Sequence, residues 1–126
     1  MPEIEIRFYR EVDDSVPLLD WLVRLPAEAR DRCIARLSLL VEKGHELRRP
    51  HAENIGDGLY ELRVKFYSEN LRMLYFFHGR TITVVSHGFS KERKIPPGEI
   101  QLAKARMDAF KAEPERHTFR PPADEE

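Results

Sequence analysis

The sequence is poor in cysteine and in long apolar segments. Its 126 residues contain a single cysteine, Cys33, which excludes an internal disulfide framework. No apolar run approaches the roughly 20 residues that a helix needs to cross a bilayer, and residues 1–14 lack the apolar segment of a signal peptide. We therefore expect a protein of the cytoplasm with no membrane partner. The length fits one domain with a single core.

The sequence also lacks the patterns of several catalytic sites. Carboxylates, histidines and cysteines do not recur at the spacing of metal ligands. Cys33 falls in a helical pattern with no evident histidine partner, and Gly56 and Gly58 flank the entry to a hairpin. These absences argue against metal-dependent hydrolysis, a cysteine nucleophile and a glycine-rich phosphate loop. We expect neither a metal nor a cofactor.

Charge is nearly balanced overall but unevenly distributed. The formal net charge is −1, yet residues 43–94 carry ten Lys or Arg against six Asp or Glu, together with four of the five histidines. Residues 1–42 and 111–126 are acidic. The basic middle of the chain is compatible with an anionic partner or with ordinary solvated charge.

Hydrophobic periodicity predicts one α+β domain over residues 1–111, in the order β-α-α-β-β-β-α. Residues 4–10 alternate as a strand, and helical spacing begins near Val16 and again after Pro26. The later elements are expected to be strands over about 59–66, 71–78 and 81–88 and a helix over about 97–111. We expect the N-terminal helical hairpin and the C-terminal helix to pack on one face of a small sheet. Residues 112–126 form an acidic, Pro-rich tail that we expect to be flexible, or to dock as an extended strap.

The expected strand registers predict a row of cationic side chains on one face of the sheet. The row sets Lys65 opposite Arg72 and Arg72 opposite His87, with Arg63 two residues away on the same face. Like charges directly opposite each other cost about 0.2–1 kcal/mol per pair, so an anionic ligand would explain the row. The alternative is that these long side chains splay into water.

These registers assume a turn at about residues 67–70 and a two-residue turn at Gly79-Arg80. The opposite face then carries only apolar and aromatic side chains: Tyr60, Leu62, Val64, Phe66, Leu71, Met73, Tyr75, Phe77, Ile82 and Val84. That face is the expected core, which the helices must cover. The cationic row is therefore expected to face away from the helices and to contain no acidic partner.

A row of this composition suits metal-free cleavage of RNA. In that reaction the 2′-hydroxyl attacks the adjacent phosphate, so the protein must stabilise the extra negative charge and protonate the leaving oxygen. Arg63, Lys65 and Arg72 can do the first, and His87 can transfer a proton. The loop after the last strand adds three basic residues that could close over the same face or simply be solvated: Lys91, Arg93 and Lys94.

Four segments carry a family resemblance: GLYELR, LRMLYFF, HGFSKERKIPPGEIQLAKAR and LVEKGHELRRP, at residues 58–63, 71–77, 87–106 and 40–50. In this order and spacing they resemble the RelE/ParE toxin superfamily of type II toxin–antitoxin modules, in its phage-derived, Gp49-like, HigB-type branch. The resemblance covers about residues 4–110. It implies a RelE-like, microbial RNase-type fold and a ribosome-dependent mRNA endoribonuclease. The implied partners are the ribosome, mRNA and a cognate antitoxin, usually a helix-turn-helix protein.

The resemblance also implies roles for individual residues. Arg63 and Arg72 occupy cationic positions on adjacent strands, and Lys91 and Lys94 belong to the family's basic loop. The remaining residues expected to meet RNA are Lys43, Arg48, Arg49, His51 and Arg93. Many relatives place a proton-transferring Tyr near the C-terminal end, where this chain has Pro96-Pro97. The proton donor therefore stays open between His87 and Lys91.

Two other functions remain open at this point. A ParE-like toxin would bind DNA gyrase without cleaving RNA, although such a protein need not gather Lys, Arg and His on one face. A catalytically weak relative would keep only antitoxin binding. Glu92 favours that reading, because it brings a negative charge into the basic loop.

Overall fold

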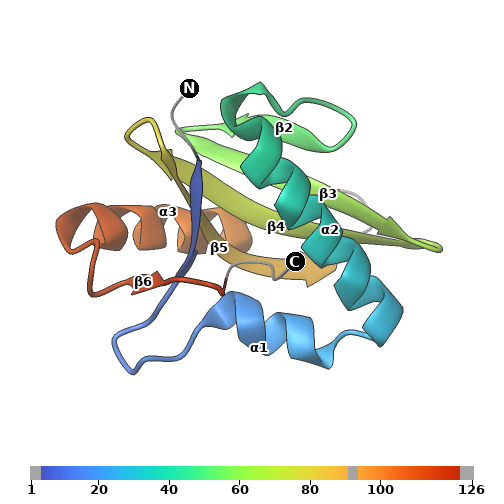
Figure 1. Ribbon diagram of the computed structural model, residues 1–126, viewed down its shortest axis with the longest axis horizontal. Coiled ribbons are helices and arrows are strands. Elements are labelled where there is room, and N and C mark those ends of the chain that lie inside the picture. The colour runs from blue at the N-terminus through green and yellow to red at the C-terminus, as the bar shows by residue number, and fades with distance from the viewer. Residues whose placement is uncertain (1–3, 91–93, 123–126) are drawn as a thin grey trace.

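The computed structural model describes residues 4–90 and 94–122 (Figure 1). Its elements are β1 (Glu5–Tyr9), α1 (Pro17–Arg24), α2 (Ala27–Lys43), the 3₁₀ turn η1 (Gly44–Glu46), β2 (Ala52–Gly56), β3 (Leu59–Phe66), β4 (Glu69–His78), β5 (Ile82–Ser90), α3 (Pro97–Ala112) and β6 (Thr118–Phe119). The strands form one sheet in the order β2-β3-β4-β5-β1-β6, in which β1 runs parallel to β5 and the other pairs are antiparallel. The α+β class and the expected element order are confirmed, with β2 and β6 as additional strands.

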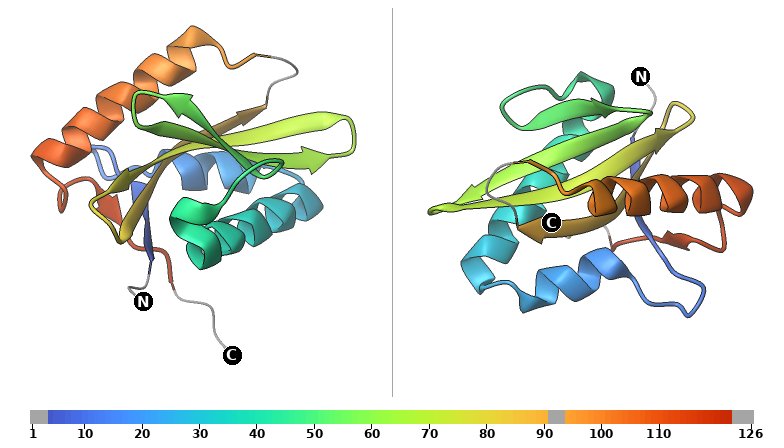
Figure 2. Two further views of the ribbon diagram at one scale, coloured as in Figure 1. Left: turned by 90° about the horizontal axis from the view of Figure 1, so that it is seen from above. Right: turned by 180° about the vertical axis from the view of Figure 1, so that it is seen from behind.

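The helices cover both faces of the sheet, so the expectation that they share one face is wrong (Figure 2). α1 and α2 pack on the face that carries Leu62 and Met73. α3 packs on the opposite face, where Phe110 lies against Leu74 and Phe76. The physical reason is that the central strand β4 is apolar on both sides, as strands buried on both faces are. One helical layer could not keep both sides from water.

A β-bulge in β5 changes which residues of that strand face which helix. Leu74 pairs with His87 but Tyr75 pairs with Val85, so Ser86 is the extra residue. A bulge shifts the alternation of side chains by one position. The bulge therefore places Phe89 on the α3 side of the core together with Val84 and Ile82. The sequence assigned Val84 and Ile82 to the α1–α2 side; they lie on the α3 side because the β4–β5 turn is one residue longer than expected, which sets Val84 opposite Phe76.

The β3–β4 hairpin turns earlier than expected. Phe66 pairs with Glu69, which leaves a turn of only two residues, and Tyr67 adopts φ 55° there. A bulky residue with positive φ is uncommon, so a tyrosine at this position does not indicate a turn. The next turn is longer than expected, since His78 pairs with Ile82.

The corrected registers rearrange the cationic row. Arg63 lies opposite Arg72, and Lys65 lies opposite Asn70. Arg72 lies opposite Phe89 on β5, so the predicted pairs of Arg72 with Lys65 and with His87 are wrong. Because the error in β3 is two residues, the face is preserved: Arg63, Lys65 and Arg72 still alternate onto one side of the sheet.

The end of the chain docks on the sheet. β6 pairs with β1 through Phe8–Phe119 and Tyr9–Thr118, and the Tyr9 and His117 rings stack with centroids 4.9 Å apart. Residues 113–122, the described part of the tail after α3, therefore form a C-terminal strap that docks through β6. The flexibility of the tail stays a prediction. None of the helices in the described ranges is long and apolar enough to cross a membrane.

Candidate functional site

A buried carboxylate joins the two arginines that face each other on β3 and β4. Glu61 is only 1% exposed, and its Oε1 accepts a hydrogen bond of 2.7 Å from Arg63 Nε. Its Oε2 accepts from Arg72 Nη1. The expectation that this cluster contains no acidic residue is therefore wrong. The signal was present in the sequence, because Glu61 lies two residues before Arg63 and so shares its face.

The charge network continues onto β2. Glu53 accepts hydrogen bonds from Arg63 and, at 2.5 Å, from Arg49 Nη2. Glu53 lies opposite Glu61 just as Arg63 lies opposite Arg72, so a row of carboxylates adjoins a row of guanidinium groups. The hydrogen bond from Arg49 holds the pKa of Glu53 below its ordinary value, and Glu61 raises the pKa of Arg63. This crossed arrangement removes most of the like-charge repulsion that the row alone would have.

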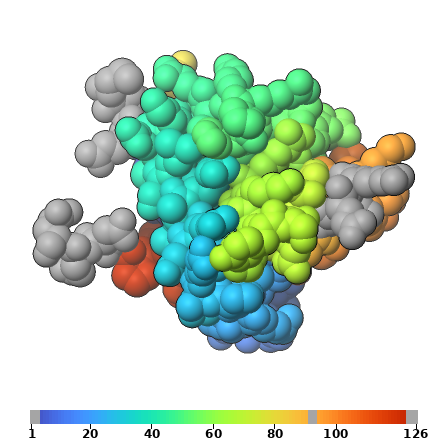
Figure 3. All heavy atoms as spheres, turned by 90° about the vertical axis from the view of Figure 1, so that its right-hand side faces the viewer, coloured from blue at the N-terminus to red at the C-terminus, as the bar shows by residue number. Residues whose placement is uncertain are grey.

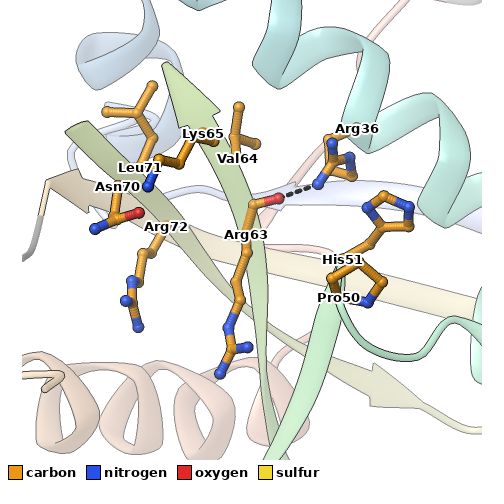
Figure 4. Close-up of a pocket in the computed structure, with 9 residues that line it drawn as sticks. All are labelled: Arg36, Pro50, His51, Arg63, Val64, Lys65, Asn70, Leu71 and Arg72. Atoms are coloured by element: carbon orange, nitrogen blue, oxygen red, sulfur yellow. Dashed lines mark hydrogen bonds between the residues drawn. The ribbon is translucent and has the colours of Figure 1, made fainter. Parts of the chain in front are cut away.

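A depression of about 330 Å³ lies beside this network (Figure 4). Its lining residues are Arg36, Pro50, His51, Arg63, Val64, Lys65, Asn70, Leu71 and Arg72. The depression exists because β2 pairs only with residues 59–62 of β3, which leaves the outer edge of β3 open beyond them. The Arg36 guanidinium of α2 reaches this edge and donates a hydrogen bond to the Arg63 carbonyl. Figure 3 shows α2 and the β3–β4 hairpin adjacent on this side of the molecule.

The cations around the depression are of two kinds. Arg63 and Arg72 are each paired with a carboxylate. Arg36, His51 and Lys65 have no carboxylate within 4.0 Å among the residues that the structure describes. The unpaired positive charges of Arg36 and Lys65 make the depression a suitable place for an anion.

His87 lies elsewhere, beneath the first turn of α3. It is 6% exposed, and its ring nitrogens hydrogen-bond to Ser86 Oγ and Glu99 Oε1, each at 2.8 Å. Burial lowers its pKa, and the nearby Arg106 guanidinium lowers it further, against the opposing effect of Glu99. His87 does not line the depression and fastens α3 to β5 in this structure.

The other predicted RNA-binding residues are dispersed. Arg48 and Arg49 line a second depression of about 480 Å³ beside Tyr60. Lys43 and Lys94 are exposed and line neither depression. Lys91 and Arg93 lie outside the described residues. The structure thus brings Arg63, Lys65, Arg72 and His51 together, and it adds three residues that the sequence analysis did not propose for the site: Arg36, Glu53 and Glu61.

Two further observations bear on the chemistry. Among the described residues no three His, Cys, Asp or Glu side chains are grouped to hold a metal ion. Cys33 is fully buried in α2, and burial raises the pKa of its thiol to about 11. That thiol is protonated near neutral pH and is a poor nucleophile.

Comparison with protein families identifies the family of the chain. Residues 20–108 match the family described as Phage derived protein Gp49-like (DUF891). The chain belongs to the Gp49-like family. This family is part of the RelE/ParE-like toxin superfamily, which confirms the resemblance found in the sequence. No curated protein matches the chain.

Membership has a direct consequence for function. The Gp49-like family suggests a toxin of the RelE/HigB type from a toxin–antitoxin module, and in general such a toxin has a cognate antitoxin. The matched range runs from within α1 to within α3, so it contains every residue that lines the depression. It excludes β1 and β6.

Proposed function

We propose that this Gp49-like protein is the toxin of a type II toxin–antitoxin module and inhibits translation as a metal-independent endoribonuclease that cleaves mRNA on the ribosome. The observation that carries the proposal is the depression at the open edge of β3, which gathers Arg63, Arg72 and Lys65 with His51. These are the residue types that metal-free transesterification of RNA needs, since the nucleophile comes from the substrate itself.

Each residue has a role in this proposal. The guanidinium groups of Arg63 and Arg72 stabilise the negative charge that develops on the phosphate, and Glu61 holds them side by side. Lys65 adds a third positive charge from the exposed end of β3. His51 replaces His87 as the first choice for the proton donor, because His51 lines the depression and His87 does not. Lys91 stays a candidate from the sequence.

A second candidate function also has support. Glu53 and Glu61 compensate the charges of Arg63 and Arg72, which reduces the attraction of the site for phosphate. A relative that retains antitoxin binding alone would tolerate such compensation. A ParE-like action on DNA gyrase draws no support from this depression.

The function is tested by expressing the chain alone and following protein and DNA synthesis in parallel. We expect growth arrest in which translation falls first, and cleavage of mRNA when purified ribosomes are added. Arg72→Ala should reduce cleavage by about 100-fold or more, which is the scale of one lost electrostatic contact to a transition state. The matched control is Arg80→Ala, which removes an exposed cation outside the depression.

The competing functions give different results. DNA synthesis that stops before translation would favour the gyrase target. Full toxicity in Arg72→Ala would contradict the assignment of the site. An intact chain without toxicity that still binds an antitoxin would favour the catalytically weak relative.

A further inference from the structure

Arg36 is the most unusual cation of the depression. It lies in the middle of α2, is half-buried, and projects toward the open edge of β3 between His51 and the Arg63 backbone (Figure 4). Burial lowers the pKa of its guanidinium. Within the described ranges its only hydrogen-bond partner is the Arg63 carbonyl, and no carboxylate lies within ion-pair distance.

A half-buried guanidinium group with so few partners lowers the stability of the fold when no ligand is bound. A charged group that loses water needs an opposite charge or several hydrogen bonds to offset the loss, and one carbonyl uses only one of the five guanidinium N–H groups. The neighbouring arginines of the sheet satisfy this requirement with Glu53 and Glu61. An anion in the depression would satisfy it for Arg36.

Arg32 provides an internal comparison. It lies one turn earlier on α2 and also donates to a β3 edge carbonyl, that of Lys65, at 3.0 Å. Unlike Arg36, it forms an ion pair with Glu28 at 2.9 Å and does not line the depression. Both arginines therefore cap a carbonyl at the edge of β3. Of the two, only Arg36 lines the depression and has no carboxylate as a partner.

We propose that Arg36 forms the centre of a phosphodiester-binding subsite at the open edge of β3, which holds the phosphate next to the one at Arg63 and Arg72. Lys65 and His51 are shared between the two phosphates. Arg36 comes from α2, Lys65 from β3 and His51 from the segment before β2, and all three line the same depression. The subsite takes its ligand class, single-stranded RNA, from the proposed function. It extends the path of the RNA strand from the sheet face around the edge of β3 toward α2.

The test uses a fluorescent 2′-O-methyl RNA pentamer, which lacks the attacking hydroxyl and cannot be cleaved by transesterification. Its Kd is measured by anisotropy over a range of salt concentrations for the wild type, Arg36→Gln and Arg32→Gln. We expect Arg36→Gln to raise Kd about tenfold and to reduce the slope of log Kd against log salt by about 0.7, the value for one phosphate contact on a single strand. Arg32→Gln should bind as the wild type does.

A variant with little structural risk supports the same inference. Lys65 is exposed, and Lys65→Gln should lower the salt slope by a similar amount without affecting thermal unfolding. Arg36→Lys should recover most of the affinity, because it restores the charge. Equal losses of affinity in Arg36→Gln and Arg32→Gln would overturn the proposal and would favour capping of the β3 edge as the role of both arginines. An unchanged salt slope in Arg36→Gln and Lys65→Gln would also overturn it. So would the absence of any binding of the pentamer by the wild type.

The subsite and the proposed function can fail separately. Cleavage of ribosome-bound mRNA by the wild type, with unchanged salt slopes in the variants, would remove the subsite and leave the function. Reduced slopes without any cleavage would support an RNA-binding subsite and remove the nuclease.

Discussion

Glu61 determines how much free positive charge the site presents. Its carboxylate lies between the guanidinium groups of Arg63 and Arg72 and is almost completely buried. The same contacts fix the orientation of both arginines, so this residue sets position as well as charge. A substitution at Glu61 should therefore affect both stability and the site.

We expect Glu61→Gln to lower the free energy of unfolding by about 1–3 kcal/mol, because two buried charge-assisted hydrogen bonds lose their anion and two guanidinium groups are left facing each other. Urea denaturation monitored by fluorescence near neutral pH measures this change. Glu46→Gln is the matched control, since Glu46 is exposed and lies in η1. Equal stability of Glu61→Gln and the wild type would show that the pair of arginines does not need a buried anion.

At the scale of elements, α1 packs closely against β5 at Trp21 and Gly88. A Cβ added to Gly88 would come within 2.3 Å of the Trp21 ring, so this position admits only glycine unless the helix moves. Gly98, in the first turn of α3, has no atom within 4 Å of its added Cβ. Gly88 therefore lies in a closely packed contact, whereas the space around Gly98 is open.

We expect Gly88→Ala to destabilise the protein by about 1–3 kcal/mol through overpacking. Gly98→Ala should stabilise it by up to about 1 kcal/mol, because alanine loses less backbone entropy in a helix. The midpoints of thermal unfolding of the two variants measure both effects. A destabilised Gly98→Ala, or a neutral Gly88→Ala, would contradict the packing of these elements.

The elements differ in how well their positions and registers could be predicted from the sequence. Alternation identified β3 and β4 and placed Arg63, Lys65 and Arg72 on one face, because period-two burial is a strong local signal. The bulge at Ser86 left no such signal, since an extra residue in a strand changes neither composition nor hydrophobicity. The Tyr67 turn was missed because the residue is not one that favours positive φ.

The residues of the site also divide into those that a local sequence pattern predicts and those that it does not. The cations that β3 and β4 contribute to the depression could be predicted from the alternation of side chains along each strand. Arg36 could not, because its position on α2 suggests a helix face and only the tertiary fold brings it to the β3 edge. Glu61 is predictable from the same alternation, because it lies two residues before Arg63 and so faces the same side of the sheet.

At the scale of the whole molecule, the C-terminal strap completes the sheet and holds β1 in place. Arg7 is buried and contacts Glu115 at 3.7 Å and Thr118 Oγ1 at 3.4 Å, while the His117 ring stacks on Tyr9. These contacts combine hydrogen bonds with aromatic stacking over a short segment. Both partners, β1 and the strap, lie outside the range that matches the family.

We expect truncation after Ala112 to lower the free energy of unfolding by at least about 2 kcal/mol, because it removes two aromatic contacts and the contacts of Arg7 with Glu115 and Thr118, which leaves Glu5 as the remaining partner of Arg7. Chemical denaturation of the truncated and full chains measures the difference. His117→Ala together with Phe119→Ala is the finer test and should account for about half of the loss. An unaltered stability after truncation would show that the strap is dispensable for the fold.

The pairing of β1 with β6 also has a consequence for the order of events during synthesis. Of the elements described above, β1 is synthesised first and its outer partner β6 is synthesised last. Contacts between such distant parts of a chain form late, because the whole intervening chain must first be made and closed into a loop. The outer edge of β1 therefore has no β6 to pair with until that strand has been synthesised, and the sheet reaches its final width only when β6 is free to fold back onto β1.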